Sequence, residues 1–223
     1  VPAHQKNPLT ASTRGVGEMI LHALEKGCRH FIIGIGGSAT NDAGIGMLKA
    51  LGYSFLDEQG LDVGEGAQAL GKVASIDAKN RHPLLDDCQF RIACDVTNPL
   101  CGENGATYIY GPQKGVTEAQ KDSLDQDMAH FADVTETTLN CAYKNYPGAG
   151  AAGGLGFAFL SYLHASLSPG VELILDAINL SDALNDADIV VTGEGQLDRQ
   201  TAMGKAPVGV AKLAKAHGAK VLA

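Results

Sequence analysis

The residues best suited to chemistry follow an apolar run, residues 31–35, that is short and β-branched enough for a buried strand. The candidate substrate- or phosphate-binding residues behind it are Gly36, Gly37, Ser38, Thr40, Asn41 and Asp42. Glycines let a ligand approach the backbone closely, and backbone N–H groups ahead of a helix attract anions. This stretch therefore predicts a site for a carboxylate or phosphate group.

A carboxylate at the end of a second apolar run is the candidate catalytic group. Asp95 ends the predicted strand 89–95, and Thr97 and Asn98 follow as further candidate binding residues. A carboxylate in this place could accept a proton from a hydroxyl group or hold a metal ion. The alternative is an Asx turn that orders the loop before Pro99. The residue types by themselves favour the catalytic and the structural role of Asp95 equally.

A glycine-rich segment and two lysines could contact phosphate. Residues 148–156, which include Gly153 and Gly154, could cradle a phosphate at the start of a helix. Close helix packing explains the small residues better when the segment is taken alone. Lys114 and Lys205 are possible phosphate partners, although a surface position is the default for any lysine.

Two carboxylates in a third glycine loop are candidates for a metal or nucleotide site. Glu194 and Asp198 follow the predicted strand 187–192. Mg²⁺ is commonly bound by one or two carboxylates together with substrate phosphates. The apolar run ahead of the loop favours this function over a solvated turn.

A dinucleotide site is an alternative for the first cluster. Residues 34–39 read G-x-G-x-x-A, and Asp57 follows about 20 residues further on, as in a dinucleotide-binding fingerprint. That fingerprint needs a helix that starts on the last small residue. Polar side chains from Ser38 to Asp42 occupy this place, which disfavours the alternative.

Alternating strands and helices are expected to position these clusters. The predicted strands are 31–35, 53–56, 89–95, 187–192 and 219–223, and the predicted helices are 15–26, 42–51, 117–139, one around 155–163, and 207–217. A loop is expected through residues 111–115, and Tyr53, Phe131 and Phe159 are expected in the core. Strands that end in glycine- and aspartate-rich loops predict an α/β fold with ligands beyond the carboxyl ends of the strands.

The composition argues against several classes of partner. The 223 residues carry a net charge of −8, include no Trp and are only 5% aromatic, which argues against binding to nucleic acid or an anionic membrane. No apolar run approaches the roughly 20 residues of a membrane span, and no signal peptide is visible. The five irregularly spaced cysteines favour reduced thiols in a cytoplasmic protein.

Five segments together resemble bacterial glycerate kinases of type I. They are residues 32–42, 93–106, 110–115, 147–156 and 191–205, in the family's order. The resemblance implies phosphorylation of D-glycerate by ATP, with ATP and Mg²⁺ as cofactors. It also implies two α/β lobes with the site in the cleft between them. Residues 1–186 would be most of an inserted α/β lobe, and residues 187–223 a β-loop-α-β unit of a Rossmann-like lobe with a parallel sheet.

By the same resemblance, Asp95 would act on the substrate hydroxyl, and Ser38, Thr40 and Asn41 would hold glycerate or phosphate oxygens. Glu194 and Asp198 would face the Mg²⁺-nucleotide. The chain departs from the family at Ala43, where a second glycine pair is usual. It also lacks the family's Asp-Ser-(Phe/Tyr)-Lys segment and Asp-Gly-Gly-Glu-Gly loop, so a fragment without activity of its own is expected.

Two other functions stay open at this point, a dinucleotide-dependent oxidoreductase and a binding module without catalysis. The sequence leaves undecided which hydroxyl group is phosphorylated, and it leaves the oligomeric state undecided.

Overall fold

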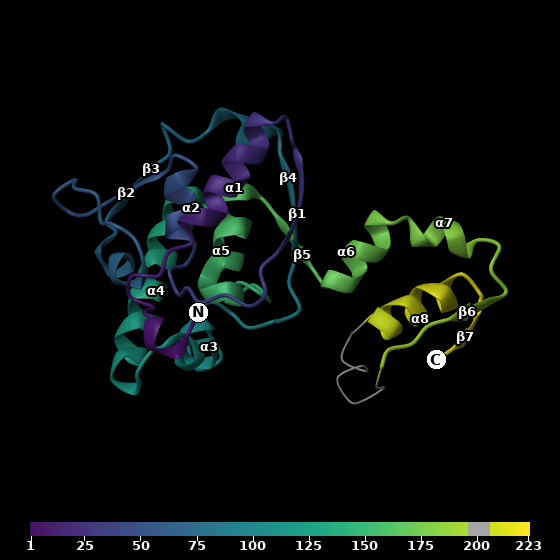
Figure 1. The fold of residues 1–223 in the computed structure, drawn as a ribbon. Helices are drawn as coiled ribbons and strands as arrows, with labels where there is room; N and C mark the ends of the chain where they lie inside the picture. Colours follow the sequence, from purple (N-terminus) through teal and green to yellow (C-terminus); the bar gives the residue numbers. More distant parts are fainter. Residues whose placement is uncertain (196–205) are drawn as a thin grey trace. The chain divides into compact units, whose positions relative to one another are not determined.

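The computed structural model describes residues 1–195 and 206–223, which form two compact units, Val1–Leu167 and Ser168–Ala223 (Figure 1). The sequence placed the boundary later, between residues 186 and 187. The structure places it earlier because α6 (Gly170–Ala177) and α7 (Leu180–Leu184) pack against α8 (Ala206–Ala216). The assignment of the units to an inserted and a Rossmann-like lobe stays a prediction.

A small sheet in the first unit sets the position of the candidate site. Its strands are β1 (His30–Gly34), β4 (Gln89–Ala93) and β5 (Ser166–Ser168), in the order β1-β4-β5. β1 and β4 run parallel, and Gly34 lies opposite Ala93 at the end of both strands. The loops after the two strands therefore leave the sheet side by side, as the α/β pattern predicted.

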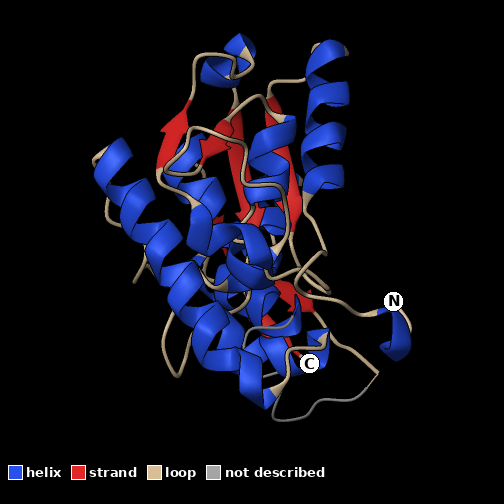
Figure 2. Cartoon of the chain, turned by 90° about the vertical axis from the view of Figure 1, so that its left-hand side faces the viewer, coloured by secondary structure: helices blue, strands red, loops and turns tan. Residues whose placement is uncertain are grey.

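Helices contribute more residues to the first unit than strands do (Figure 2). They are α1 (Arg14–Glu25), α2 (Ile45–Ala50), α3 (Ala106–Lys114), α4 (Glu118–Leu139) and α5 (Ala151–Leu163), with short 3₁₀ turns at Ala3–Gln5, Ala67–Lys72 and Pro83–Asp87. An antiparallel pair, β2 (Ser54–Leu56) and β3 (Ser75–Asp77), completes this unit. No helix among the described residues combines the length and the apolar character that a membrane crossing needs.

Aromatic side chains build the core of the first unit. Phe90 on β4 stacks on Phe31 with ring centroids 4.9 Å apart and meets Phe159 of α5 at 6.2 Å. Tyr53, Phe131 and Phe159 are buried, which confirms the predicted core positions. Ring pairs of this kind add about 0.5–1.5 kcal/mol beyond their burial. The core thereby fixes β4, whose end carries Asp95, against α5.

The described residues of the second unit contain the two strands and the helix of the predicted β-loop-α-β unit. β6 (Ile189–Val191) and β7 (Lys220–Leu222) pair in parallel, and Val190 and Val221 pack with Leu184, Ala214 and Ala219. The opposite face is open, because Ile189, Val191 and Leu222 are 57%, 77% and 58% exposed. Parallel sheets are normally covered on both faces, so this small core supports its strands from one side only.

We expect the amides of the described residues in 187–223 to exchange with solvent faster than those of residues 15–165. Each covered apolar side chain contributes about 1.5–3 kcal/mol, and the open face of β6 and β7 lacks that contribution. Hydrogen exchange read by mass spectrometry on this chain measures the difference. Equal protection of the two regions would contradict the prediction.

Candidate active site

A pocket of about 220 Å³ opens where the loops after β1 and β4 leave the sheet. Its walls come from residues 35–38 after β1, residues 93–96 at the end of β4, Tyr110 and Gln113 on α3, and Ala151 and Ala152 at the start of α5. The structure thus brings together four of the predicted site residues, Gly36, Gly37, Ser38 and Asp95. The volume is below the roughly 300–1,000 Å³ typical of sites for larger organic ligands, which suits a small ligand.

Asp95 is the carboxylate that the structure places in this pocket. It lies just past the end of β4 and is exposed. Its neighbour Cys94 is half-buried, and burial raises the pKa of the Cys94 thiol, which donates to the Val96 carbonyl oxygen at 3.3 Å. The thiol is therefore neutral near pH 7.

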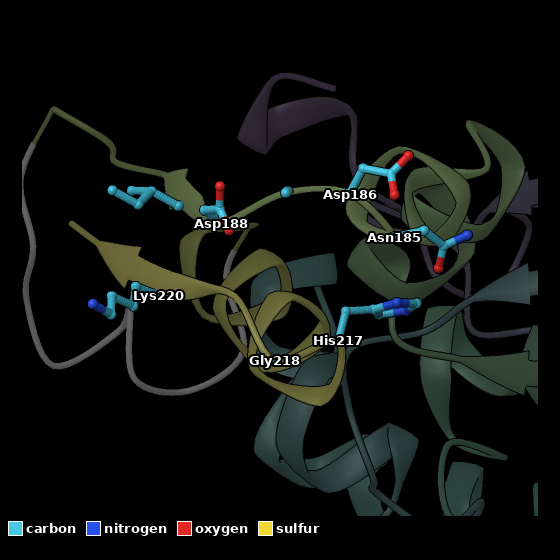
Figure 3. A pocket seen from close by; sticks show the side chains of 8 residues that line it. Asn185, Asp186, Asp188, His217, Gly218 and Lys220 are labelled. Atoms are coloured by element: carbon cyan, nitrogen blue, oxygen red, sulfur yellow. The ribbon is translucent and has the colours of Figure 1, made fainter.

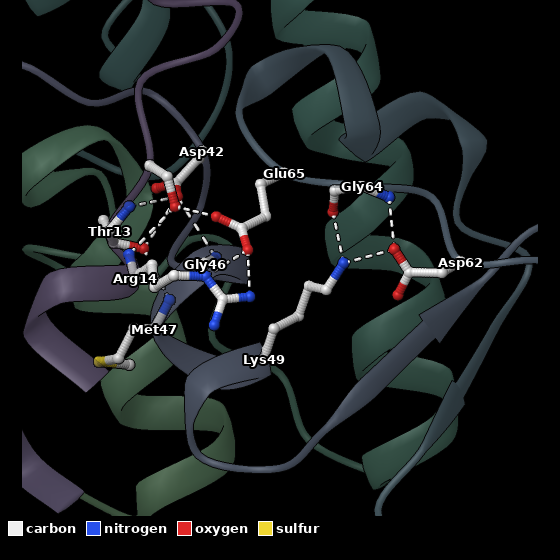
Figure 4. A network of polar contacts seen from close by, with 10 residues as sticks. Thr13, Arg14, Asp42, Gly46, Met47, Lys49, Asp62, Gly64 and Glu65 are labelled. Atoms are coloured by element: carbon white, nitrogen blue, oxygen red, sulfur yellow. Dashed lines mark hydrogen bonds and ion pairs between the residues drawn. The ribbon is translucent and has the colours of Figure 1, made fainter. Parts of the chain in front are cut away.

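Asp42 holds the loop after β1 instead of lining the pocket (Figure 4). Its carboxylate is buried and accepts four hydrogen bonds, from the Thr13 backbone and hydroxyl (2.8 Å each), Gly44 N–H (3.2 Å) and Gly46 N–H (3.3 Å). Burial raises the pKa of Asp42, and these donors oppose the rise. Asp42 was predicted to begin the next helix. It does accept a hydrogen bond from Gly46 in the first turn of α2, although that helix starts only at Ile45.

Thr40, which is partly buried, and the buried residues Asn41 and Lys114 lie outside the pocket lining. The Lys114 ammonium donates to the Thr40 carbonyl oxygen at 2.8 Å, and the Asn41 amide donates to the Thr107 hydroxyl at 3.0 Å. Lys114 is only 2% exposed, and its burial lowers its pKa to about 8 while the Asp42 charge opposes the shift. A direct phosphate contact for these three residues stays a prediction, and the bonds present join them to other groups of the protein.

Asn98, Thr97 and the glycines of residues 148–156 also lie outside the pocket lining. The Asn98 carbonyl oxygen accepts bonds from Gly148 N–H (3.2 Å) and Gly150 N–H (3.0 Å), so this residue ties the β4 loop to the start of α5. A Cβ atom on Gly153 would meet the Thr40 carbonyl oxygen at 2.1 Å, and one on Gly154 would meet the Ala43 Cα at 2.7 Å. Close packing therefore accounts for the two glycines, while Thr97 is exposed.

Tyr110 and Gln113 are pocket residues that the site prediction missed. A loop was expected through residues 111–115 because Gly111 and Pro112 interrupt the pattern, but this was wrong. α3 continues to Lys114 and ends at Gly115, whose φ of 101° lies in the left-handed region. Pro112 is tolerated close to the end of the helix. The i, i+3 spacing of Tyr110 and Gln113 was the signal that places both on one helix face.

The fingerprint of a dinucleotide site is not realised at residues 34–39. Such a site needs a helix that opens on the last small residue of the motif. Here the chain continues through the polar residues, and α2 starts only at Ile45. The structure therefore agrees with the preference against the dinucleotide alternative.

A larger hollow of about 590 Å³ lies within the second unit (Figure 3). Asn185, Asp186, Asp188, His217 and Lys220 line it. These residues lie at the amino ends of β6 and β7, whereas ligands of open α/β sheets bind beyond the carboxyl ends of the strands. The smaller pocket in the first unit is therefore the better candidate, since it lies at the ends where β1 and β4 finish.

The predicted metal site is only partly within the described residues. Glu194 is exposed in the loop after β6, while Asp198 and Lys205 lie outside the described residues. Residues 1–195 and 206–223 contain no group of three or more His, Cys, Asp or Glu that could hold a metal ion. A Mg²⁺ ion bound chiefly through phosphates needs no such group.

Comparison with known proteins identifies relatives over the whole chain. Residues 1–223 match the model of the glycerate kinase family. The glycerate kinase of Bacillus subtilis (strain 168) is 49% identical and the glycerate 2-kinase of Escherichia coli (strain K12) is 48% identical, and each alignment covers 100% of this chain and 58% of the relative. The crystal structure of a glycerate kinase 2 from Salmonella typhimurium LT2 superposes with a TM-score of 0.93 at 45% identity, covering 99% of this chain and 59% of that one. The chain therefore spans little more than half the length of these relatives.

We expect Asp42→Asn to destabilise the chain by about 3 kcal/mol, because an amide presents a donor to N–H groups that need an acceptor. Urea unfolding measures the loss. Asp62→Asn is the matched control, since Asp62 is 54% exposed and exposed ion pairs contribute less than about 1 kcal/mol. Equal losses in the two variants would contradict the role given to Asp42.

We expect Lys114 to make stability depend on alkaline pH. Its pKa is about 8 in the folded protein and 10.5 ordinarily, so between these values the unfolded chain binds more protons. The free energy of unfolding then rises with pH across this window, by at most about 3 kcal/mol. Lys114→Met should remove that rise. Urea unfolding of both proteins from pH 7 to 10.5 measures it, and parallel curves would refute the prediction.

Proposed function

The chain belongs to the glycerate kinase family, and we propose that the full-length protein transfers the γ-phosphoryl group of ATP to a hydroxyl group of D-glycerate. The names of the relatives support this reaction. The structural observation that carries the proposal is the small pocket that joins Asp95 to the glycine loop 36–38. A cytoplasmic location, and inactivity of the 223-residue chain by itself, stay predictions.

In this proposal Asp95 acts on the hydroxyl group that is phosphorylated. The carboxylate orients the hydroxyl and accepts its proton as the oxygen bonds to the γ-phosphorus, and the bond from that phosphorus to the leaving oxygen of ADP breaks. Protein groups contribute to such transfers mainly by positioning and by stabilising charge. The exposed position of Asp95 at the pocket suits a group that must meet both substrate and phosphate.

The glycine loop is the proposed anion site. Gly36, Gly37 and Ser38 line the pocket, and their backbone N–H groups and the Ser38 hydroxyl would hold the glycerate carboxylate or a phosphate oxygen. The absence of side chains at the two glycines allows close approach, and a Cβ on either would meet nothing within 4 Å. The loop therefore has open space where a ligand would lie.

Glu194 and Asp198 are the proposed protein partners of the nucleotide. They would hold Mg²⁺, which accompanies ATP and neutralises phosphate charge when bound. The position of Glu194 in the loop after β6 supports this assignment, because nucleotide phosphates in α/β folds lie beyond the carboxyl ends of strands.

We expect Asp95→Asn in the full-length protein to lower kcat for D-glycerate by about 100- to 10,000-fold, since the amide cannot accept the proton. ADP release that depends on D-glycerate is the measurement. The melting temperature should stay within a degree or two, because Asp95 is exposed.

Asp87→Asn is the matched control. Asp87 is also exposed, at the end of the turn Pro83–Asp87, and it does not line the pocket. Its variant should keep the wild-type rate. An Asp95→Asn protein that retains most of its activity would remove Asp95 from the catalytic role, and a wild-type protein without D-glycerate-dependent turnover would refute the proposed function.

A further inference from the structure

α3 contributes a wall of the pocket that the proposed reaction does not yet use. Tyr110 and Gln113 lie on one face of this helix and line the pocket together with Asp95. Tyr110 is partly buried, and the phenol oxygen is the one polar atom of its side chain. What this oxygen offers a substrate depends on where its hydrogen atom goes.

Asn98 determines the direction of the Tyr110 hydroxyl. The Asn98 side-chain amide donates through Nδ2 to the Asn104 carbonyl oxygen at 2.8 Å, which leaves Oδ1 on the other side of the group. Oδ1 lies 2.7 Å from the Tyr110 phenol oxygen and can only accept. Tyr110 therefore donates its one hydrogen atom to Asn98.

The Tyr110 oxygen is consequently an acceptor toward any further partner. Burial, and to a lesser degree the neighbouring Cys94, raise the pKa of Tyr110, so the phenol stays protonated near neutral pH. The Cys94 thiol directs its own hydrogen to the Val96 carbonyl oxygen, so it offers no competing donor. A phenol oxygen of this kind attracts a hydroxyl group and offers nothing to a carboxylate or phosphate oxygen.

We propose that the Tyr110 oxygen accepts a hydrogen bond from the substrate hydroxyl group that is not phosphorylated, which makes the pocket selective for vicinal dihydroxy acids over monohydroxy acids. The inference rests on the proposed function, in which Asp95 takes the reacting hydroxyl and the glycine loop takes the carboxylate or phosphate. A site built to bond a hydroxyl group rejects an analogue that lacks it, since its polar group is then left without a partner.

The test compares Tyr110→Phe with the wild type in the full-length protein. D-glycerate is the dihydroxy substrate, and D-lactate and 3-hydroxypropanoate each retain one of its two hydroxyl groups. We expect kcat/KM for D-glycerate to fall about 10-fold in Tyr110→Phe. One of the two monohydroxy acids lacks the hydroxyl group that bonds to Tyr110. For that acid, kcat/KM should be the same in Tyr110→Phe and in the wild type. Where turnover is too slow to measure, the competitive inhibition constant of that acid is compared instead.

Tyr108→Phe is the matched control on the same helix. The Tyr108 hydroxyl donates to the Asp122 carboxylate, and Tyr108 does not line the pocket. This variant should keep the wild-type preference for D-glycerate over both monohydroxy acids. The melting temperatures of both variants are also measured. They show whether a change in kinetics comes from a loss of stability or from a change in substrate selectivity.

Two outcomes would overturn the inference while the proposed function stands. One is a Tyr110→Phe protein with wild-type kinetics. The other is an equal loss toward D-glycerate and both monohydroxy acids, which would mean that Tyr110 only packs against its neighbours. A wild-type protein that shows no turnover of D-glycerate would instead refute the proposed function, and this inference with it.

Discussion

The buried carboxylate of Asp42 is the interaction on which the shape of the pocket depends. Taking a charged carboxylate out of water costs several kcal/mol unless its oxygen atoms accept enough hydrogen bonds. Here the donors are Thr13, the residue just before α1, and the N–H groups of Gly44 and Gly46 at the start of α2. These hydrogen bonds fix the position of the backbone on both sides of Asp42. On one side the glycine loop runs back to β1, and on the other the Ala43 N–H donates to the Gly153 carbonyl oxygen at 2.9 Å.

The polar residues near the pocket fall into two groups, those that line the pocket and those that lie outside its lining and bond to other protein groups. Asp95, Ser38 and Tyr110 line it, while Lys114 and Asn98 lie outside its lining and bond to neighbouring protein groups. Such support matters for catalysis, because groups held in position before the substrate arrives need no rearrangement during the reaction. A pocket of this kind follows from the parallel pairing of β1 and β4, which brings two loops to one edge of the sheet.

The sequence predicted the elements and the edge of the sheet better than it predicted the role of each polar side chain. Apolar runs, capping residues and glycines act locally, so five strands (β1, β2, β4, β6 and β7), α1, α4 with its Thr117–Gln120 cap, and Asp95 just past a strand end could be recognised. The short strands β3 and β5 were not predicted. The bonds from Asp42 to the N–H groups of Gly44 and Gly46 follow from its place before a helix, but the two bonds from Thr13 come from 29 positions away in sequence, and no local pattern records them. The burial of Lys114 and the helical course of residues 106–114 also depend on tertiary packing, which overrides the signals of Gly111 and Pro112.

The glycines at the start of α5 bear on how this protein can change during evolution. A Cβ on Gly150, Gly153 or Gly156 would lie 2.1–2.2 Å from a main-chain carbonyl oxygen, of Pro99, Thr40 and Gly148 respectively. When a larger residue collides with a side chain, a second substitution can shorten that side chain and restore the fit. No second substitution shortens a carbonyl group. A second substitution therefore cannot compensate for a larger residue at any of these three positions. Residues around the pocket can vary only where side chains line it, as on α3.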